Sequence, residues 1–211
     1  MRSILALLAL SMTLTAVADT PSGKTADTAP APSAKLVSTQ AALRDLWVGH
    51  IFWVREVARG LMEKDQSAVK TAEQQAVDNA RKIAGAIEPF YGKAASDQLF
   101  KLLAGHYTAV KSHASATAAK SSADAKKAVD ELTANANEIA KFLSGANPYL
   151  PEATLRSLLA AHGGHHVQQN QQLAAKDFAA EARTWETMKE HIYKISDALV
   201  GALAKQFPEK F

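Results

Sequence analysis

The sequence repeats itself with a period of 56 residues. His50, His106 and His162 are separated by this interval, and the apolar residues around them recur in the same register. A shift of 56 residues aligns Leu43 with Leu99 and Leu155, Leu46 with Leu102 and Leu158, and Ile83 with Ile139 and Ile195. Because a constant period of this length is typical of repeated supersecondary units, we predict three copies of one unit, over residues 36–91, 92–147 and 148–211.

Each unit contains two segments in which apolar residues are spaced three and four apart. Such spacing places one buried stripe along a helix. In the first unit the stripes lie on either side of a polar break at residues 63–67, with Leu43, Trp47, Val54, Val57 and Leu61 before it and Val69, Ala72, Ala76, Ala80 and Ile83 after it. No segment alternates apolar and polar residues over the length of a strand. The chain is therefore predicted to be an all-α six-helix bundle made of three helical-hairpin repeats of about 56 residues.

Small polar residues mark the expected starts of the second helix in each unit. Ser67, Ser122 and Asp177 are the predicted N-terminal caps, because their side-chain oxygens can accept hydrogen bonds from the free backbone N–H groups of the first turn. The connections within the hairpins are short. Consecutive helices are therefore expected to pack as antiparallel neighbours.

A polar layer interrupts the apolar stripes at the repeated histidines. Within each hairpin, the histidine and one polar residue of the second helix are equally distant from the predicted loop, so both lie at the same height. These pairs are His50 with Asn79, His106 with Asn135, and His162 with His191. One interpretation is structural: each pair forms a buried hydrogen bond that sets the register of its hairpin.

The other interpretation of the histidines is a metal site. His162 and His166 are four residues apart and share one face of a helix, and His191 lies opposite them, so one hairpin offers three imidazoles to zinc or copper. Three pseudo-symmetric hairpins would also permit His50, His106 and His162 to converge on one ion. No carboxylate recurs at the same level of every unit, which counts against that second arrangement.

The N-terminal residues have the pattern of a secretory signal peptide. Residues 1–18 combine Arg2, an apolar stretch and the small residues Ala16 and Ala18 around a cleavage point. Residues 19–35 are rich in proline and poor in large apolar residues, which predicts a flexible linker before a helical domain over residues 36–211. We expect a periplasmic or secreted protein that keeps no stable membrane anchor after cleavage. The intact mass of the mature protein should correspond to a chain that starts at Asp19, and a mass that retains the leader would contradict export.

Composition excludes several classes of function. The chain has no cysteine, so disulfides, thiolate metal sites and thiol nucleophiles are absent. Its 24 basic and 21 acidic residues do not form the clustered basic surface of a nucleic-acid-binding protein. No familiar catalytic motif is present. We therefore expect an exported, non-catalytic binding or scaffold protein whose partner is an unknown protein or small ligand; the alternative is a periplasmic transition-metal-binding protein.

Several motifs resemble an all-helical bacterial family without an established activity, whose members carry inconsistent, transferred enzyme names. The resemblance covers most of the domain and implies an all-helical fold without specifying a reaction. The His165-His166 pair does not belong to the family pattern. The motifs that carry the resemblance are Leu46-Trp47-x-x-His50-x-x-Trp53-x-Arg55, Asn135-Ala136-x-Glu138-Ile139-Ala140-x-Phe142-Leu143, Asn147-Pro148 and Gln206-Phe207-Pro208.

Overall fold

The computed structural model of the chain describes residues 32–211, and it confirms an all-α six-helix bundle over that range. The predicted signal peptide and most of the predicted linker lie outside the described residues. The helices are α1 (Ala34–Glu63), α2 (Gln66–Gly85), α3 (Glu88–Ala118), α4 (Ser122–Ala146), α5 (Glu152–Ala175) and α6 (Phe178–Gln206), followed by the short 3-10 helix η1 (Pro208–Lys210). Helix α1 starts two residues before the predicted domain boundary at residue 36, because the Ser33 hydroxyl caps it by accepting from the backbone N–H of Leu36.

The same tight turn joins the two helices of each hairpin. A lysine in the left-handed backbone conformation lies between the two helices, and the next residue caps the second helix. The lysines are Lys64, Lys120 and Lys176, with φ angles of 60°, 57° and 58°, and the caps are Asp65, Ser121 and Asp177. The three turns are 56 residues apart, whereas superposition of the three whole hairpins remains a prediction.

The structure differs from the sequence-based prediction at two of the three helix caps. Asp177 is confirmed, since its carboxylate accepts from the backbone N–H of Ala180. Ser67 and Ser122 instead lie inside their helices, because α2 begins at Gln66 and α4 begins at Ser122 itself. In the first hairpin the Asp65 carboxylate already accepts from two backbone N–H groups, which leaves Ser67 no capping role.

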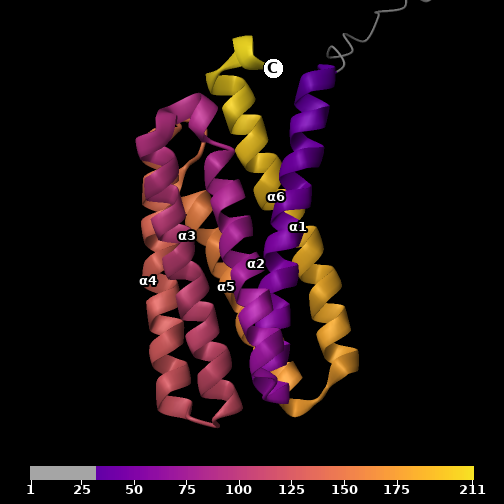
Figure 1. Cartoon of the computed structure of the whole chain (residues 1–211). Helices are drawn as coiled ribbons and strands as arrows, with labels where there is room; N and C mark the ends of the chain where they lie inside the picture. Colours follow the sequence, from indigo (N-terminus) through magenta and orange to yellow (C-terminus); the bar gives the residue numbers. More distant parts are fainter. Residues whose placement is uncertain (1–31) are drawn as a thin grey trace, which may run out of the picture. The chain divides into compact units, whose positions relative to one another are not determined.

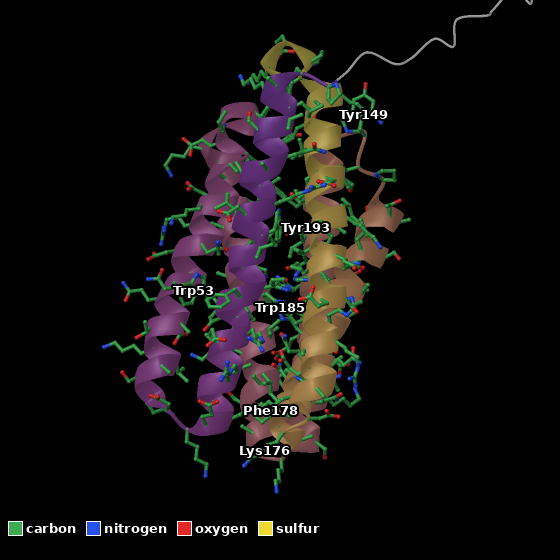
Figure 2. All side chains as sticks on the ribbon, turned by 90° about the vertical axis from the view of Figure 1, so that its right-hand side faces the viewer. Trp53, Tyr149, Lys176, Phe178, Trp185 and Tyr193 are labelled. Atoms are coloured by element: carbon green, nitrogen blue, oxygen red, sulfur yellow. The ribbon has the colours of Figure 1, made fainter. Side chains whose placement is uncertain are left out.

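The three odd-numbered helices form the centre of the bundle. Helices α1, α3 and α5 contact one another, and each even-numbered helix packs between two of them: α2 between α1 and α3, α4 between α3 and α5, and α6 between α5 and α1 (Figure 1). The hairpin turns lie at one end of the bundle, where Figure 2 labels Lys176 and Phe178, and Tyr149 lies at the opposite end. Side chains that point inward from α1, α3 and α5 therefore meet on the central axis.

A buried ion pair links α1 to α6 near the turn end of the bundle. The Arg55 guanidinium donates to both carboxylate oxygens of Glu181 at 2.6 Å, and the Gln169 amide donates to the same carboxylate at 2.7 Å. Burial acts to raise the pKa of Glu181, but these hydrogen bonds outweigh it and hold the pKa below its ordinary value. The carboxylate is therefore ionised and already neutralised by its partner.

Among the residues that the structure describes, no helix is both long enough and apolar enough to cross a bilayer.

Candidate metal centre

Four histidines from three helices meet on the axis of the bundle. His50 comes from α1, His106 from α3, and His162 and His166 from α5. The ring centroids of His50, His106 and His162 form a triangle with sides of 5.5, 5.7 and 6.1 Å. The His166 ring lies 4.6 to 6.0 Å from these three, one turn further along α5. We call these four residues the histidine tetrad.

The tetrad is buried, and most of its ring nitrogens lack a hydrogen-bond partner among the described residues. The four side chains are between 1 and 4% exposed. Six of the eight ring nitrogens are buried without a hydrogen bond to any described residue: Nε2 of His50, Nδ1 and Nε2 of His106, Nδ1 and Nε2 of His162, and Nε2 of His166. A buried polar atom without a partner costs about 1–3 kcal/mol, so a purely structural layer would be expected to provide partners for these atoms.

Burial keeps the four imidazoles neutral. It lowers the pKa of His50 to about 3, and the neighbouring His106 adds to the effect. Burial likewise lowers the pKa of His106 to about 4, with the Asn135 side chain opposing part of the shift. The pKa values of His162 and His166 lie well below the ordinary value, first through burial and then through the other histidines of the tetrad. Neutral imidazole is the form that coordinates metal ions.

The geometry of the tetrad suits a single ion. One nitrogen from each ring can be chosen so that all four lie within 4.8 Å of one another. Nitrogens at the corners of a tetrahedral zinc site with Zn–N bonds of about 2.0–2.1 Å are separated by about 3.3 Å. The four rings would therefore have to move closer together around a bound ion. No carboxylate belongs to this group, and the buried Glu181 is held by Arg55 and Gln169.

The tetrad differs from the three-histidine set predicted for the third hairpin. His162 and His166 belong to it, whereas His191 lies outside it, because its Nε2 bonds to the carbonyl of Leu158 at 2.8 Å. His165 also lies outside, with its ring centroid 5.4 Å from that of His191. The packing instead brings together histidines from all three hairpins, which is the second arrangement considered from the sequence.

The structure also differs from the predicted histidine–asparagine pairs. The Asn79 amide donates to the backbone carbonyl of Leu46 at 3.0 Å, and the Asn135 amide donates to that of Leu102 at 3.0 Å. Each carbonyl belongs to the residue four positions before a tetrad histidine. Each asparagine does lie at the height of its histidine, as predicted. Its side-chain amide, however, contacts the backbone of the neighbouring helix, and the imidazole faces the axis of the bundle.

Glycine residues make room for these amides. A Cβ on Gly49 would lie 2.9 Å from Nδ2 of Asn79, and a Cβ on Gly105 would lie 2.9 Å from Nδ2 of Asn135. The third hairpin has Ala161 at the corresponding position and uses the longer side chain of His191 as the contact. Across the three hairpins, glycine before the histidine therefore occurs with asparagine on the opposite helix, and alanine occurs with histidine.

This pairing predicts the effect of alanine at Gly105. An alanine there would displace the Asn135 amide and break its bond to Leu102, which costs about 1–3 kcal/mol, whereas its higher helix propensity returns about 1 kcal/mol, so Gly105→Ala should leave the free energy of unfolding unchanged or lower it by up to about 2 kcal/mol. The control is Gly164→Ala, where an added Cβ meets no atom within 4 Å. Its higher helix propensity should raise stability by about 1 kcal/mol. Urea unfolding of both variants checks the prediction, and equal stabilisation by both would contradict it.

Comparisons of the chain with protein-family models, with curated proteins and with solved structures give no match, so the assignment of a function depends on the histidine tetrad itself.

Proposed function

We propose that the protein binds one transition-metal ion through the histidine tetrad, and that metal binding or sequestration is its function. The observation that carries the proposal is the convergence of four buried, neutral imidazoles, six of whose eight ring nitrogens are buried without a hydrogen bond to any described residue. A metal ion supplies the missing partner to all four rings at once. Export, predicted from residues 1–18, would place the site in the periplasm or outside the cell.

Zinc and copper are the ions that the ligand set favours. Imidazole suits both ions. The four ligands carry no charge, so a divalent ion would leave two uncompensated positive charges in a buried site. The Born cost of burying an ion grows with the square of its charge, so a monovalent copper ion would pay about a quarter of the cost of a divalent ion of the same size. We therefore place Cu(I) first and Zn(II) second.

Metal analysis of protein produced without a polyhistidine tag tests the proposal. We expect one equivalent of copper or zinc per chain after anaerobic loading and removal of excess ion by dialysis. His166→Gln should reduce the affinity by at least 100-fold, because it removes one of four ligands.

The matched controls are His165→Gln and His191→Gln, which change two histidines of the same hairpin outside the tetrad. Both variants should keep the wild-type stoichiometry and affinity. If the His191 variant loses the metal and a variant of His50 keeps it, the result would instead support the site predicted within the third hairpin. No bound metal in the wild-type protein would overturn the proposal and leave the tetrad as a structural layer.

A further inference from the structure

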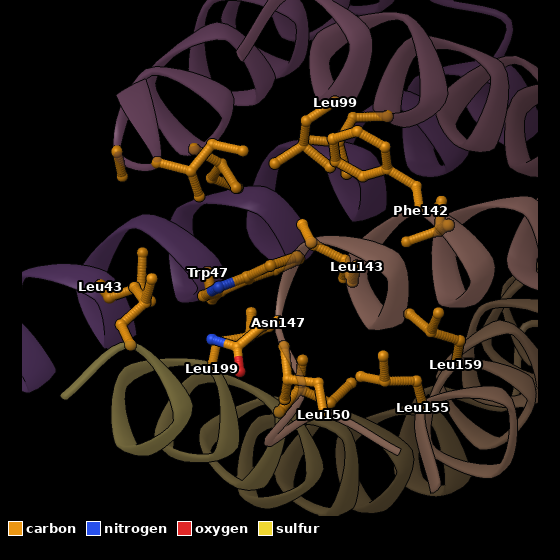
Figure 3. Close-up of a pocket in the computed structure, with 18 of the residues that line it drawn as sticks. Leu43, Trp47, Leu99, Phe142, Leu143, Asn147, Leu150, Leu155, Leu159 and Leu199 are labelled. Carbon is orange, nitrogen blue, oxygen red and sulfur yellow. The ribbon is translucent and has the colours of Figure 1, made fainter. Parts of the chain in front are cut away.

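An apolar cavity lies directly against one face of the tetrad. It has a volume of about 80 Å³ and is lined by residues of all six α-helices, including Trp47, Leu143 and Leu159 (Figure 3). His50, His106 and His162 belong to its wall, whereas His166 does not. On α1, α3 and α5 every lining residue either precedes or is the tetrad histidine of that helix, so the cavity begins at the histidine triangle and extends away from the hairpin turns.

His166 lies on the other side of this triangle. It follows His162 by one turn of α5, in the direction of the hairpin turns, and its ring approaches all three triangle histidines. An ion within the triangle would therefore have three imidazoles around it, His166 on one side and the cavity on the other. The coordination position opposite His166 faces no protein ligand.

The cavity limits what can reach that position. At about 80 Å³ it is roughly half the size of an engineered cavity of about 150 Å³ that binds benzene or xenon. Tyr91 and Asn147 of its wall are joined by polar contacts, in which the Asn147 amide donates to the Tyr91 hydroxyl at 2.9 Å and that hydroxyl donates to Gln206 at 2.6 Å. The wall is nearly all apolar, so a charged ligand would lose its hydration without compensation. The buried indole N–H of Trp47, which has no acceptor among the described residues, would suit a ligand with an acceptor atom.

We infer that a small uncharged diatomic molecule of the carbon monoxide, nitric oxide or dioxygen type reaches the metal ion from the cavity and takes the fourth coordination position in exchange for His166, while His50, His106 and His162 continue to hold the ion. The inference rests on the proposed metal site and names a ligand that this site would take. Carbon monoxide is the probe, because it binds Cu(I) without a redox change and its stretching band reports binding directly. The Cu(I)-loaded protein should bind one CO per copper, with an infrared band that shifts on 13C substitution.

The position three residues before each triangle histidine provides the test variant. It is Trp47, Leu103 and Leu159 in successive hairpins, so Leu159→Trp introduces a side chain that the first hairpin already carries. The larger ring should fill the cavity and weaken CO binding at least tenfold while one copper per chain remains bound. Val110→Leu is the control, because Val110 is buried one turn beyond His106 and does not line the cavity. It should leave CO affinity within about twofold of wild type.

A second variant keeps the test decisive if Leu159→Trp does not fold. Leu143 is only partly buried and lines the cavity, so Leu143→Ala should enlarge it and admit tert-butyl isocyanide, which the wild-type protein should reject. The inference would be overturned if the protein binds one copper per chain but no CO. It would also be overturned if neither cavity variant alters the binding of CO and isocyanide. Both outcomes would leave the metal site intact. Failure to bind copper or zinc at all would instead refute the proposed function.

Discussion

Replacing His106 by leucine is expected to abolish tight metal binding and to stabilise the metal-free protein. Both ring nitrogens of His106 are buried without a hydrogen bond, and leucine of similar size removes both unpaired polar atoms. The free energy of unfolding in the presence of a chelator should rise by about 1–3 kcal/mol. With free metal at about 1,000 times the dissociation constant, the wild-type protein should gain about 4 kcal/mol, and the variant should gain nothing under the same conditions.

His113→Leu is the matched control for this experiment. His113 is as deeply buried as His106 and lies on the same helix, but its Nδ1 is 3.0 Å from the Asn170 amide. Leucine there would remove the shorter of the two hydrogen bonds of a buried amide and leave only the one of 3.5 Å to the Val110 carbonyl, so stability should fall by about 1–3 kcal/mol with or without metal. Urea unfolding with chelator and with metal separates the two histidines. A loss of stability in His106→Leu equal to that in His113→Leu would show that the tetrad is structural.

The metal-free protein should unfold on mild acidification. Burial lowers the pKa of His50 to about 3 and that of His106 to about 4, and it lowers the pKa values of His162 and His166 well below the ordinary value. In the unfolded chain all four should titrate near pH 6.5. Above that pH the rings are neutral in both states and stability does not depend on them. Below it the unfolded state takes up protons that the native state excludes, so stability falls until the pH reaches the folded pKa values.

The expected slope is steep because four groups act together. Each histidine contributes about 1.4 kcal/mol per pH unit, so the tetrad contributes on the order of 5 kcal/mol per unit below pH 6.5. A typical domain is stable by about 5–15 kcal/mol, which this slope removes over about one to three units below pH 6.5, so unfolding is expected between about pH 5.5 and pH 3.5. Circular dichroism at graded pH with a chelator measures this transition. His106→Leu should reduce the slope by about a quarter, and a free energy of unfolding that is flat from pH 6.5 to pH 5 would contradict the burial of neutral rings.

The helices and their places in the chain could be predicted from the sequence because the forces that define them are local. Apolar residues at spacings of three and four predict the buried stripes, and short polar breaks predict the turns. The same spacing showed that His50, His106 and His162 occupy core positions. Where local prediction failed, as at Ser67, the reason was an equally local competitor: the Asp65 carboxylate already caps the helix.

Only the tertiary structure decided which of these histidines lie together. Equal distance from a turn placed Asn135 at the height of His106, but the sequence did not show that the amide would instead reach the carbonyl of Leu102. His50, His106 and His162 come together only because α1, α3 and α5 pack around one axis. This packing brings together residues that are 56 and 112 positions apart in the sequence. Periodicity within one helix shows which residues face inward, and the packing of several helices determines what they meet there. That packing brings His166 under the triangle and holds His191 outside it.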